Sequence, residues 1–351
     1  GAIGGFSAPY GVAYNPVNGL IYVTDEGSGE VVLVDPETHG IVRRLGGAGD
    51  ARGVGIDRVT GTAYVAVPAE VGTGAVRAYT LADAAGGSEG TLINSVGVGP
   101  SLVAVDSATH RVYVTLQGEM VNGLAVIEGA DPGYGVTHVS INVQGAYGIG
   151  YDGVRQRLYV ASGTGATLTV IDVTKVGGPG DPVVAAVKTT PEYSLDALAV
   201  SSVTGRVYVA GRRELTAKVW VLEGGTNSWL ASYEVGSYSD GALMRGVSYD
   251  PVTGWVYVSS EHADRVYILD DCSGSAAPTP TPTPTESPCV PGLVGTPVAV
   301  GVDPYGSASD EEDEVFVADH GAGTVTVLQG SVVVGAIGGF SAPYGVAYNP
   351  V

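Results

Sequence analysis

The sequence predicts an all-β protein with the fold of a seven-bladed β-propeller, in which each blade has four antiparallel strands. A short motif, made of an apolar residue, an aromatic residue, Val and a small residue, occurs seven times along the chain. Seven copies in a period of 334 residues leave about 48 residues each, a length that suits a four-stranded blade. The composition agrees, because β-branched residues and Tyr dominate the apolar set and no window reads as a long helix.

The seven copies of the motif are expected to form the second strand of each blade. The aromatic residue is Tyr in the first six copies and Phe in the last. The copies are Ile21–Thr24, Ala63–Ala66, Val112–Thr115, Leu158–Ala161, Val207–Ala210, Val256–Ser259 and Val315–Ala318.

About nine residues before each copy lies a run of small and apolar residues that ends at a polar residue, most often Asp. The Gly and Ala content predicts innermost strands, since seven strands must crowd around one axis. The polar residue then opens a turn. The runs are Gly11–Asn15, Gly53–Asp57, Val103–Asp106, Gly148–Asp152, Leu198–Ser201, Gly246–Asp250 and Val300–Asp303.

Two further strands follow each motif, such as the alternating run Leu168–Asp172 and then Val183–Val187. Four strands in each of seven blades account for nearly the whole chain. One propeller is therefore expected over residues 1–337. Its predicted blades are 6–47, 48–97, 98–143, 144–190, 191–237, 238–295 with an insert at 273–288, and 296–337.

This pattern resembles the YVTN-type β-propeller repeat family, whose blade reads roughly P-x-G-V-A, then D-G, then V-Y-V-T-N, then V-x-V-I-D. Blade one supplies Pro9–Ala13, Asn18-Gly19, Ile21–Asp25 and Val32–Asp35. The Asn that closes the family motif is absent: Asp25 and Asp319 replace it in two blades, and other residues replace it in the rest. The resemblance implies seven blades and a surface or secreted protein, including surface-layer proteins. It implies little about chemistry, because propellers host unrelated functions.

The first 17 residues of the chain, Gly1–Val17, are identical to the last 17, Gly335–Val351, at an offset of 334 residues. Sister repeats within one fold diverge more than this, so we interpret residues 338–351 as the start of a next, identical propeller. The identity favours a tandem array or a filament of identical domains. A permuted or overlap-engineered chain is the alternative interpretation.

The copy begins inside the predicted outer strand of blade seven, so this region is the expected assembly seam. Identical propellers could follow one another covalently, which we favour, or a terminal strand could pair with the edge of a neighbouring propeller. The expected partner is thus the chain itself, head to tail. The seam residues are Val332, Val334, Ala336, Ile337, Phe340, Tyr344, Val346, Ala2, Ile3, Phe6 and Tyr10.

Two cysteines, Cys272 and Cys289, flank a low-complexity insert and predict a disulfide that ties its base, which implies an oxidising, extracellular compartment. Thr beside Pro is the composition of O-glycosylated stalks. The candidate modification sites are Thr279, Thr281, Thr283 and Thr285. A tolerated loop is the alternative interpretation of this insert.

The formal net charge of −20 is unfavourable for binding nucleic acid or anionic lipid, and no apolar run is long enough to span a membrane. An acidic run between the first two strands of blade seven is a weak candidate for binding Ca²⁺, which prefers oxygen ligands. A solvated acidic hairpin is the favoured interpretation. The run is Asp310, Glu311, Glu312, Asp313 and Glu314. No other cofactor is expected.

Alignment of the innermost strands predicts which residues surround one mouth of the axial pore. They could bind a small anion or a sugar, although neutralisation of surrounding acids is the favoured role of the two arginines. The mouth residues are Tyr10, Arg52, Ser101, Tyr147, Asp196, Arg245 and Val298.

No nucleophile elbow, phosphate loop, metal-ligand spacing or catalytic carboxylate pair occurs in the sequence, so no catalytic residue is predicted. We expect a non-catalytic extracellular structural protein that builds a cell-surface fibre, sheath or adhesive layer, with surface glycans as possible further partners. The alternatives are a secreted, lyase-like propeller enzyme and a module that binds glycans or small ligands in the axial pocket.

Overall fold

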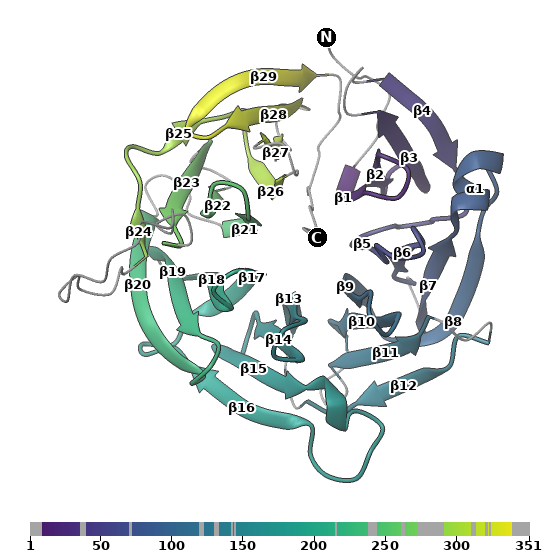
Figure 1. The fold of residues 1–351 in the computed structure, drawn as a ribbon, viewed down its shortest axis with the longest axis horizontal. Helices are drawn as coiled ribbons and strands as arrows, with labels where there is room; N and C mark the ends of the chain where they lie inside the picture. The colour runs from purple at the N-terminus through teal and green to yellow at the C-terminus, as the bar shows by residue number, and fades with distance from the viewer. Residues whose placement is uncertain are drawn as a thin grey trace, which may run out of the picture.

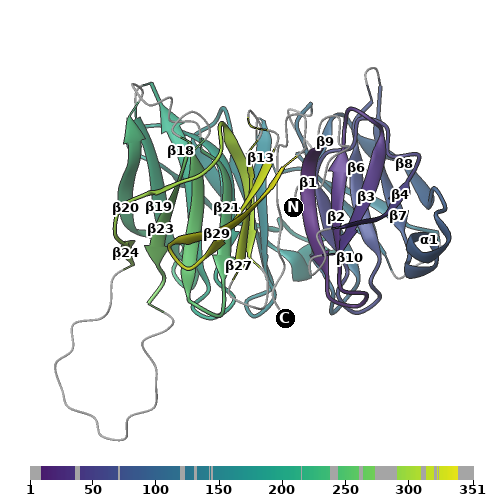
Figure 2. The ribbon, with the colours of Figure 1, turned by 90° about the horizontal axis from the view of Figure 1, so that it is seen from above.

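The computed structural model of the chain is a ring of seven β-sheets around a central axis (Figure 1). The structure describes residues 9–35, 40–69, 72–118, 123–129, 133–141, 143, 145–214, 216–237, 244–260, 264–272, 291–309, 314–319, 322 and 324–338. Strands within each sheet are antiparallel and follow chain order from the axis outward. The prediction of an all-β, seven-bladed β-propeller is therefore confirmed. Seen from the side, the strands run between the two faces of the disc (Figure 2).

The first three blades contain twelve strands. From the axis outward they are β1 (Pro9–Asn15), β2 (Leu20–Asp25), β3 (Glu30–Asp35) and β4 (Gly40–Leu45); β5 (Val54–Ile56), β6 (Ala63–Val67), β7 (Gly74–Tyr79) and β8 (Thr91–Gly97); and β9 (Pro100–Asp106), β10 (Arg111–Leu116), β11 (Leu124–Glu128) and β12 (Val136–Val139). A short helix, α1 (Leu81–Gly86), lies between β7 and β8 and was not expected from the sequence. Among the described residues, no helix has the length and apolar character to cross a membrane.

The remaining four blades follow the same plan. Their strands are β13 (Ala146–Asp152), β14 (Arg157–Ser162), β15 (Thr167–Asp172) and β16 (Val183–Lys188); β17 (Ser194–Val200), β18 (Arg206–Arg213), β19 (Thr216–Glu223) and β20 (Ser228–Ser237); β21 (Met244–Asp250), β22 (Trp255–Ser260), β23 (Arg265–Asp270), β24 (Gly292–Leu293) and β25 (Val298–Ala299); and β26 (Pro304–Ser309), β27 (Glu314–Asp319), β28 (Thr324–Gln329) and β29 (Val332–Gly338). A single turn of 3-10 helix, Val173–Lys175, follows β15.

The Tyr of the recurring motif is a principal core residue in each of the first six blades. These tyrosines are at most 2 % exposed, and each belongs to an apolar cluster that its blade shares with the next one. Tyr22, for example, packs in one cluster with Leu33 of its own blade and Ile56 of blade two. Because successive side chains of a strand point to opposite faces, the core is a series of clusters between neighbouring blades. The six tyrosines are Tyr22, Tyr64, Tyr113, Tyr159, Tyr208 and Tyr257.

The boundary between blades six and seven lies later in the sequence than predicted. Val298 was expected in the innermost strand of blade seven, but it lies in β25 and pairs with Val266 of β23, at the outer edge of blade six. The innermost strand of blade seven is β26, which begins with Pro304. After the insert, the outer strand of blade six forms in two short pieces and so extends past residue 295. The apolar run Val300–Asp303 imitates an innermost strand, whereas the Pro-Tyr-Gly that opens β1 recurs at residue 304.

Candidate functional site

The polar residues that end the innermost strands lie on one face of the disc, where tight turns lead to the second strands. We call this the turn face. Asp57 Oδ1 accepts hydrogen bonds from the backbone amides of Val59 at 3.0 Å and Thr60 at 3.3 Å. Asp152 Oδ1 accepts from the amide of Val154 at 3.0 Å. These side chains hold the turns that they were predicted to open.

Side chains on the turn face also bind the next blade, so they form a belt around the ring. Asn15 Nδ2 donates to the carbonyl oxygen of Gly61 at 2.8 Å. Asp57 Oδ2 lies 2.6 Å from His110 Nδ1 of blade three, and this carboxylate is only 1 % exposed. Asn15 and Asp57 thus each hold a turn and also bond to the next blade. The other links are Tyr151 to Asp106, Arg155 to Thr204, Ser201 to Asp271, and Ser309 to the carbonyl oxygen of Tyr249.

Asp271, directly after β23, is a buried carboxylate that joins blade six to blade five. Ser201 Oγ donates to its Oδ2 at 2.6 Å, Thr204 Oγ1 donates to the same oxygen at 3.0 Å, and the Tyr208 hydroxyl donates to Oδ1. Arg206 Nη1 lies 3.7 Å from Oδ1. Burial raises the pKa of the Asp271 carboxyl above its ordinary value, and these donors and Arg206 oppose that rise.

The position of Asp271 is an exception among the blades. In blades three and five, the residue that follows the third strand is a glycine beside the hydroxyl of the preceding blade's motif Tyr: Gly129 beside Tyr64, and Gly224 beside Tyr159. Only blade six has an acid there. Cys272 and the insert follow it at once, so Asp271 anchors the base of the insert to blade five. In the sequence, the equivalent residues elsewhere are Pro36, Thr80, Gly129, Val173, Gly224 and Gly330.

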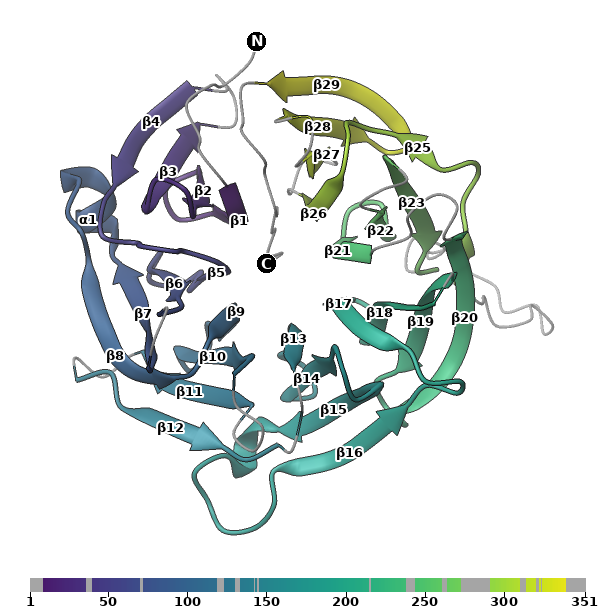
Figure 3. The ribbon, with the colours of Figure 1, turned by 180° about the vertical axis from the view of Figure 1, so that it is seen from behind.

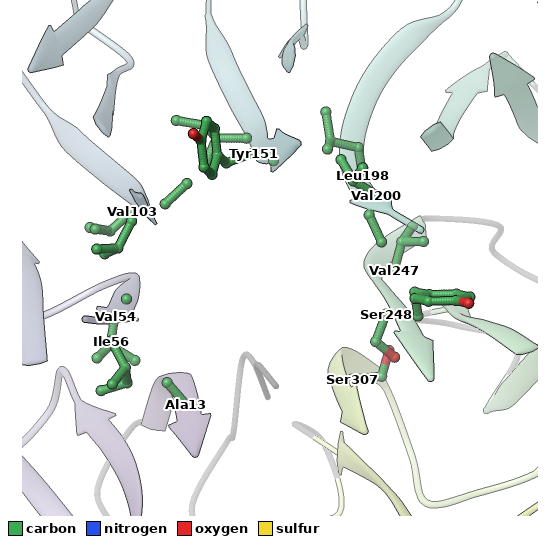
Figure 4. A pocket seen from close by; sticks show the side chains of 17 residues that line it. Ala13, Val54, Ile56, Val103, Tyr151, Leu198, Val200, Val247, Ser248 and Ser307 are labelled. Atoms are coloured by element: carbon green, nitrogen blue, oxygen red, sulfur yellow. The ribbon is translucent and has the colours of Figure 1, made fainter. Parts of the chain in front are cut away.

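The axial channel contains a cavity of about 250 Å³ with a largely aliphatic wall (Figure 4). Val54, Val103 and Leu198 project toward its centre from different blades, and Ser248 and Ser307 add polar atoms on one side. The Oγ atoms of these two serines are 2.9 Å apart, so they bind each other.

The predicted mouth residues lie on the opposite face, where the outer strand of one blade leads to the innermost strand of the next. We call this the crossover face. The guanidinium of Arg52 lies 5.8 Å from the centre of the Tyr10 ring, and its Nη1 donates to Gln117 Oε1 at 3.1 Å. Gln117 Nε2 in turn donates to Ser101 Oγ at 2.9 Å. Three of the predicted residues therefore meet, through a Gln that the sequence analysis missed.

The other mouth residues have different surroundings. Asp196 pairs with Arg212 Nε at 3.2 Å, and Ser194 Oγ donates to Asp196 Oδ1 at 3.0 Å. The side chain of Tyr147 is 36 % exposed. The side chain of Arg245 lies outside the described residues, and Val298 belongs to the outer edge of blade six. Both described charges at the mouth are thus already engaged within the protein.

β29 and β1 are the described parts of the seam. Gly335 opens the C-terminal copy and pairs with Val327 of β28, so the copy begins inside an outer strand, as predicted. Val332, Val333 and Val334 are 60 %, 44 % and 50 % exposed, and β29 has no polar side chain. Ala336 is also exposed. From behind, β29 ends on one side of the closure and β4 begins on the other side (Figure 3). β29 is therefore an uncharged sheet edge, a form that pairs readily with other strands.

Several predicted sites fall outside the described residues. Cys272 has no free thiol, but Cys289 is not described, and the pairing of these two cysteines stays a prediction. Of the acidic run only Glu314 is described, at the start of β27. Over the described residues, no group of three or more His, Cys, Asp or Glu side chains could hold a metal ion. The other sites outside this range are Thr279, Thr281, Thr283, Thr285, Asp310, Glu311, Glu312, Asp313, Ala2, Ile3, Phe6, Phe340, Tyr344 and Val346.

Fold and channel together define the class of protein, a seven-bladed β-propeller. Solved structures with the same fold include hydrazine synthase of Kuenenia stuttgartiensis, which is 16 % identical with a TM-score of 0.72 over 94 % of this chain and 98 % of that chain. The Cps50 (Swd1) β-propeller domain of Myceliophteria thermophila is 11 % identical, with a TM-score of 0.69 over 92 % and 97 % of the two chains. A functionally unknown protein from Desulfotomaculum acetoxidans is 13 % identical, with a TM-score of 0.58 over 74 % and 81 %.

These likenesses show the fold alone, because the sequences differ so widely and one of the similar structures is an enzyme. No family matches the sequence of this chain, and no curated protein matches it. The relation to the YVTN-type family accordingly stays a prediction from the motif.

Proposed function

We propose that this chain is a non-catalytic structural protein of the cell surface, whose identical propellers join in series into a fibre, sheath or adhesive layer. The observation that carries the proposal is the 17-residue identity together with the places of its two copies. One copy supplies β1, the innermost strand of blade one, and the other begins within β29, the outer strand of blade seven. The repeated sequence therefore spans the passage from the last blade to the first.

The exposed edge of blade seven supports this proposal. Molecules with a net charge of −20 repel one another over most of their surface. β29 is an exception, since three adjacent valines are exposed and none of its side chains is charged. A covalent tandem explains the sequence identity most simply, and pairing of a strand with a neighbouring propeller is the second arrangement.

The insert of blade six supports a place outside the cell. Cysteines on either side of a Thr-Pro segment favour a bridged, O-glycosylated projection, with surface glycans as further partners. Asp271 fastens the base of this insert to the ring. Non-reducing peptide mapping tests the bridge, and mass measurement of the peptide that contains Thr279 to Thr285 tests the glycans.

Electron microscopy of native material tests assembly directly. We expect fibres or sheets whose repeat is close to the size of one propeller, and isolated discs would overturn the proposal. Intact mass under reducing, denaturing conditions then separates the two arrangements. A covalent array has masses that are multiples of about one period, whereas a ladder that collapses to a single mass near 35.4 kDa indicates strand pairing between separate chains. A substrate turned over in the axial channel would favour the enzyme alternative.

A further inference from the structure

Five exposed valines occupy the same place in the turns of the turn face that join the first strand of a blade to the second. Each is the second residue after the polar residue that ends the innermost strand. Because the innermost strands surround the axis (Figure 1), these turns encircle one mouth of the channel. The corresponding turn of blade seven lies outside the described residues. We call the five valines the valine ring: Val17, Val59, Val154, Val203 and Val252, which are 44 %, 66 %, 81 %, 59 % and 56 % exposed.

The turns hold these valines in a fixed position. The amide of Val59 donates to Asp57 Oδ1 at 3.0 Å, and the amide of Val252 donates to Asp250 Oδ1 at 2.8 Å. The amide of Gly61, which has a φ of 72°, closes the turn of blade two on the carbonyl oxygen of Asp57 at 2.7 Å. The buried polar residue thus holds the backbone inward while the valine side chain faces solvent. A partner that binds this ring has little loop freedom to remove, and preorganisation of this kind favours binding.

The turn itself does not require a valine. Blade three has Ala108 at this place, and its amide makes the equivalent bond, to Asp106 Oδ1 at 3.1 Å. The residues that stabilise such turns are Asp, Asn, Ser and Gly, and they are already present at the neighbouring positions. Single exposed apolar side chains are ordinary on a protein surface, but five at equivalent places around one mouth indicate an interaction surface.

The tips of the six described turns lack the acidic residues that are frequent elsewhere in the chain. None of the four residues after each turn-opening polar residue is Asp or Glu, and two of them are arginines, Arg58 and Arg155. In the sequence, blade seven is the exception, because the acidic run stands in its turn. The acids that open the described turns lie beneath the tips and are at most 5 % exposed: Asp57, Asp106, Asp152 and Asp250. A net charge of −20 repels copies of the chain from one another, and the six described tips add nothing to that repulsion.

We propose that the valine rings of two copies of this chain pack against each other, turn face to turn face. A second copy has the same apolar tips at the same spacing around its axis, and a two-fold pair needs such a self-complementary surface. The described parts of the seam, the end of β29 and the start of β1, lie at the crossover face, so joining in series leaves the turn face of each propeller accessible. Association of neighbouring fibres through this face rests on the proposed function, whereas pairing of two turn faces is tested on single chains.

Analytical ultracentrifugation of the full chain tests the pairing. We expect a monomer–dimer equilibrium with a Kd on the order of 10–100 μM, as for a small, weak interface. Val59→Thr with Val154→Thr keeps the shape of both side chains and should raise the Kd at least about tenfold, because hydroxyl groups replace methyl groups in the contact. Val42→Thr with Val184→Thr is the matched control on outer strands, where the valines are 50 % and 36 % exposed, and it should leave the Kd unchanged. A chain that stays monomeric up to about 1 mM, or equal Kd values for the two double variants, would overturn the proposal.

A substitution in blade three should strengthen the pairing. Ala108→Val adds the missing valine to the ring, and the turn that carries it is already held by the bond to Asp106. The Kd should fall about two- to fivefold, since two more apolar side chains are buried in each pair. Ala108→Ser is the control and should give no gain. A Kd that does not fall with Ala108→Val, although the thermal midpoint shows a folded protein, would contradict packing of the rings.

Chemical cross-linking shows which faces meet. Val203→Cys treated with a short bismaleimide should give covalent dimers, and Val42→Cys on the outer strand of blade one should not. No dimers from Val203→Cys, or equal yields from both variants, would overturn pairing through the turn face. Adsorption of the unchanged chain to phosphatidylcholine vesicles without dimers would assign the ring to a lipid surface and would also overturn it. Dimers linked through Val203→Cys in material without fibres would refute the proposed function alone, whereas fibres without such dimers would refute the pairing alone.

Discussion

Six junctions of the ring differ from the seventh, where blade seven meets blade one. Each of the six has an apolar cluster that contains a motif Tyr, and each has a polar link on the turn face. At the closure, the described structure has Val23 and Val32 buried on the face of blade one that points away from blade two, and Phe316 and Val327 buried in blade seven. The innermost strands that meet there, β26 and β1, touch least.

The difference teaches how a ring made of repeats is closed. Covalent connections carry the chain across six junctions, and clusters and belt then fix each blade against the next. At the seventh, two segments far apart in the sequence must meet, so the loop entropy of closure opposes the contact. Four predictions test the contrast between the six linked junctions and the closure.

The largest effect is expected at a fully linked junction, between blades five and six. Asp271→Ala should remove about 3–5 kcal/mol from the free energy of unfolding, since Ser201, Thr204 and Tyr208 lose their acceptor and Arg206 loses its counter-charge. Chemical denaturation followed by circular dichroism measures it. Asp271→Asn keeps the shape and one acceptor oxygen, and it should cost clearly less. A loss under 1 kcal/mol for the Ala variant would contradict this interpretation of the network.

A second effect is expected at the crossover end of blade seven. Asp319 is fully buried, and burial raises the pKa of its carboxyl to about 6, although Thr324 and Thr326 donate to its Oδ2 at 2.9 and 2.6 Å. Because the folded-state pKa is raised above the unfolded value of 3.8, the contribution to stability is full below about pH 4 and is lost as the pH rises through 6. The loss is about 3 kcal/mol. Asp319→Asn should remove this pH dependence, as urea denaturation between pH 4 and 7 can measure.

Asp172 is the matched control for that experiment because the sign of its effect is opposite. Thr174 and then Arg157 lower the pKa of its carboxyl below the ordinary value of 3.8. Its contribution to stability is therefore present above that value and is lost as the pH falls below it. Asp172→Asn should leave the slope between pH 4 and 7 unchanged. An equal slope in the unchanged protein and in the Asp319 variant would refute the role of Asp319.

A smaller effect is expected from one link of the belt. His110→Asn should cost about 1–2 kcal/mol, because the shorter side chain leaves the buried Asp57 carboxylate without its partner at 2.6 Å. Asn is chosen because residue 110 has a φ of 60°, which Asn tolerates. Arg111→Ala, which breaks a partly exposed pair with Glu128, should cost under 1 kcal/mol. Equal losses from the two variants, read as shifts of the thermal midpoint, would show that the belt adds nothing at this junction.

The repeat pattern was sufficient to predict the fold. Residues at equivalent positions have the same role in successive blades: motif residues such as Tyr22 pack between blades, and residues such as Asp57 hold the turns. Prediction was wrong where a blade departs from the pattern. After the insert, the outer strand of blade six forms in two short pieces, and Val298 lies in the second of them. Short apolar runs look alike, and only strand pairing separates an innermost strand from an outer one.

The candidate sites were less predictable for a related reason. Alignment of the innermost strands found Arg52 and Ser101, but Gln117 comes from another strand, and no spacing in the sequence brings it between them. Asp271 left a signal that could have been used. Alignment of the residues after each third strand would have shown an acid where other blades have Pro, Gly, Thr or Val.

The smallest effect on stability, and the most direct on association, is expected at the exposed edge of the closure. Val333→Lys in β29 should change the free energy of unfolding by under 0.5 kcal/mol, since the side chain is 44 % exposed. A charge on a sheet edge opposes pairing with another strand, so the variant should raise the protein concentration needed for assembly, as measured by sedimentation. Val184→Lys in β16 is the matched control, at 36 % exposed on the outer strand of blade four. If both variants assemble alike, the edge of blade seven has no special part in association.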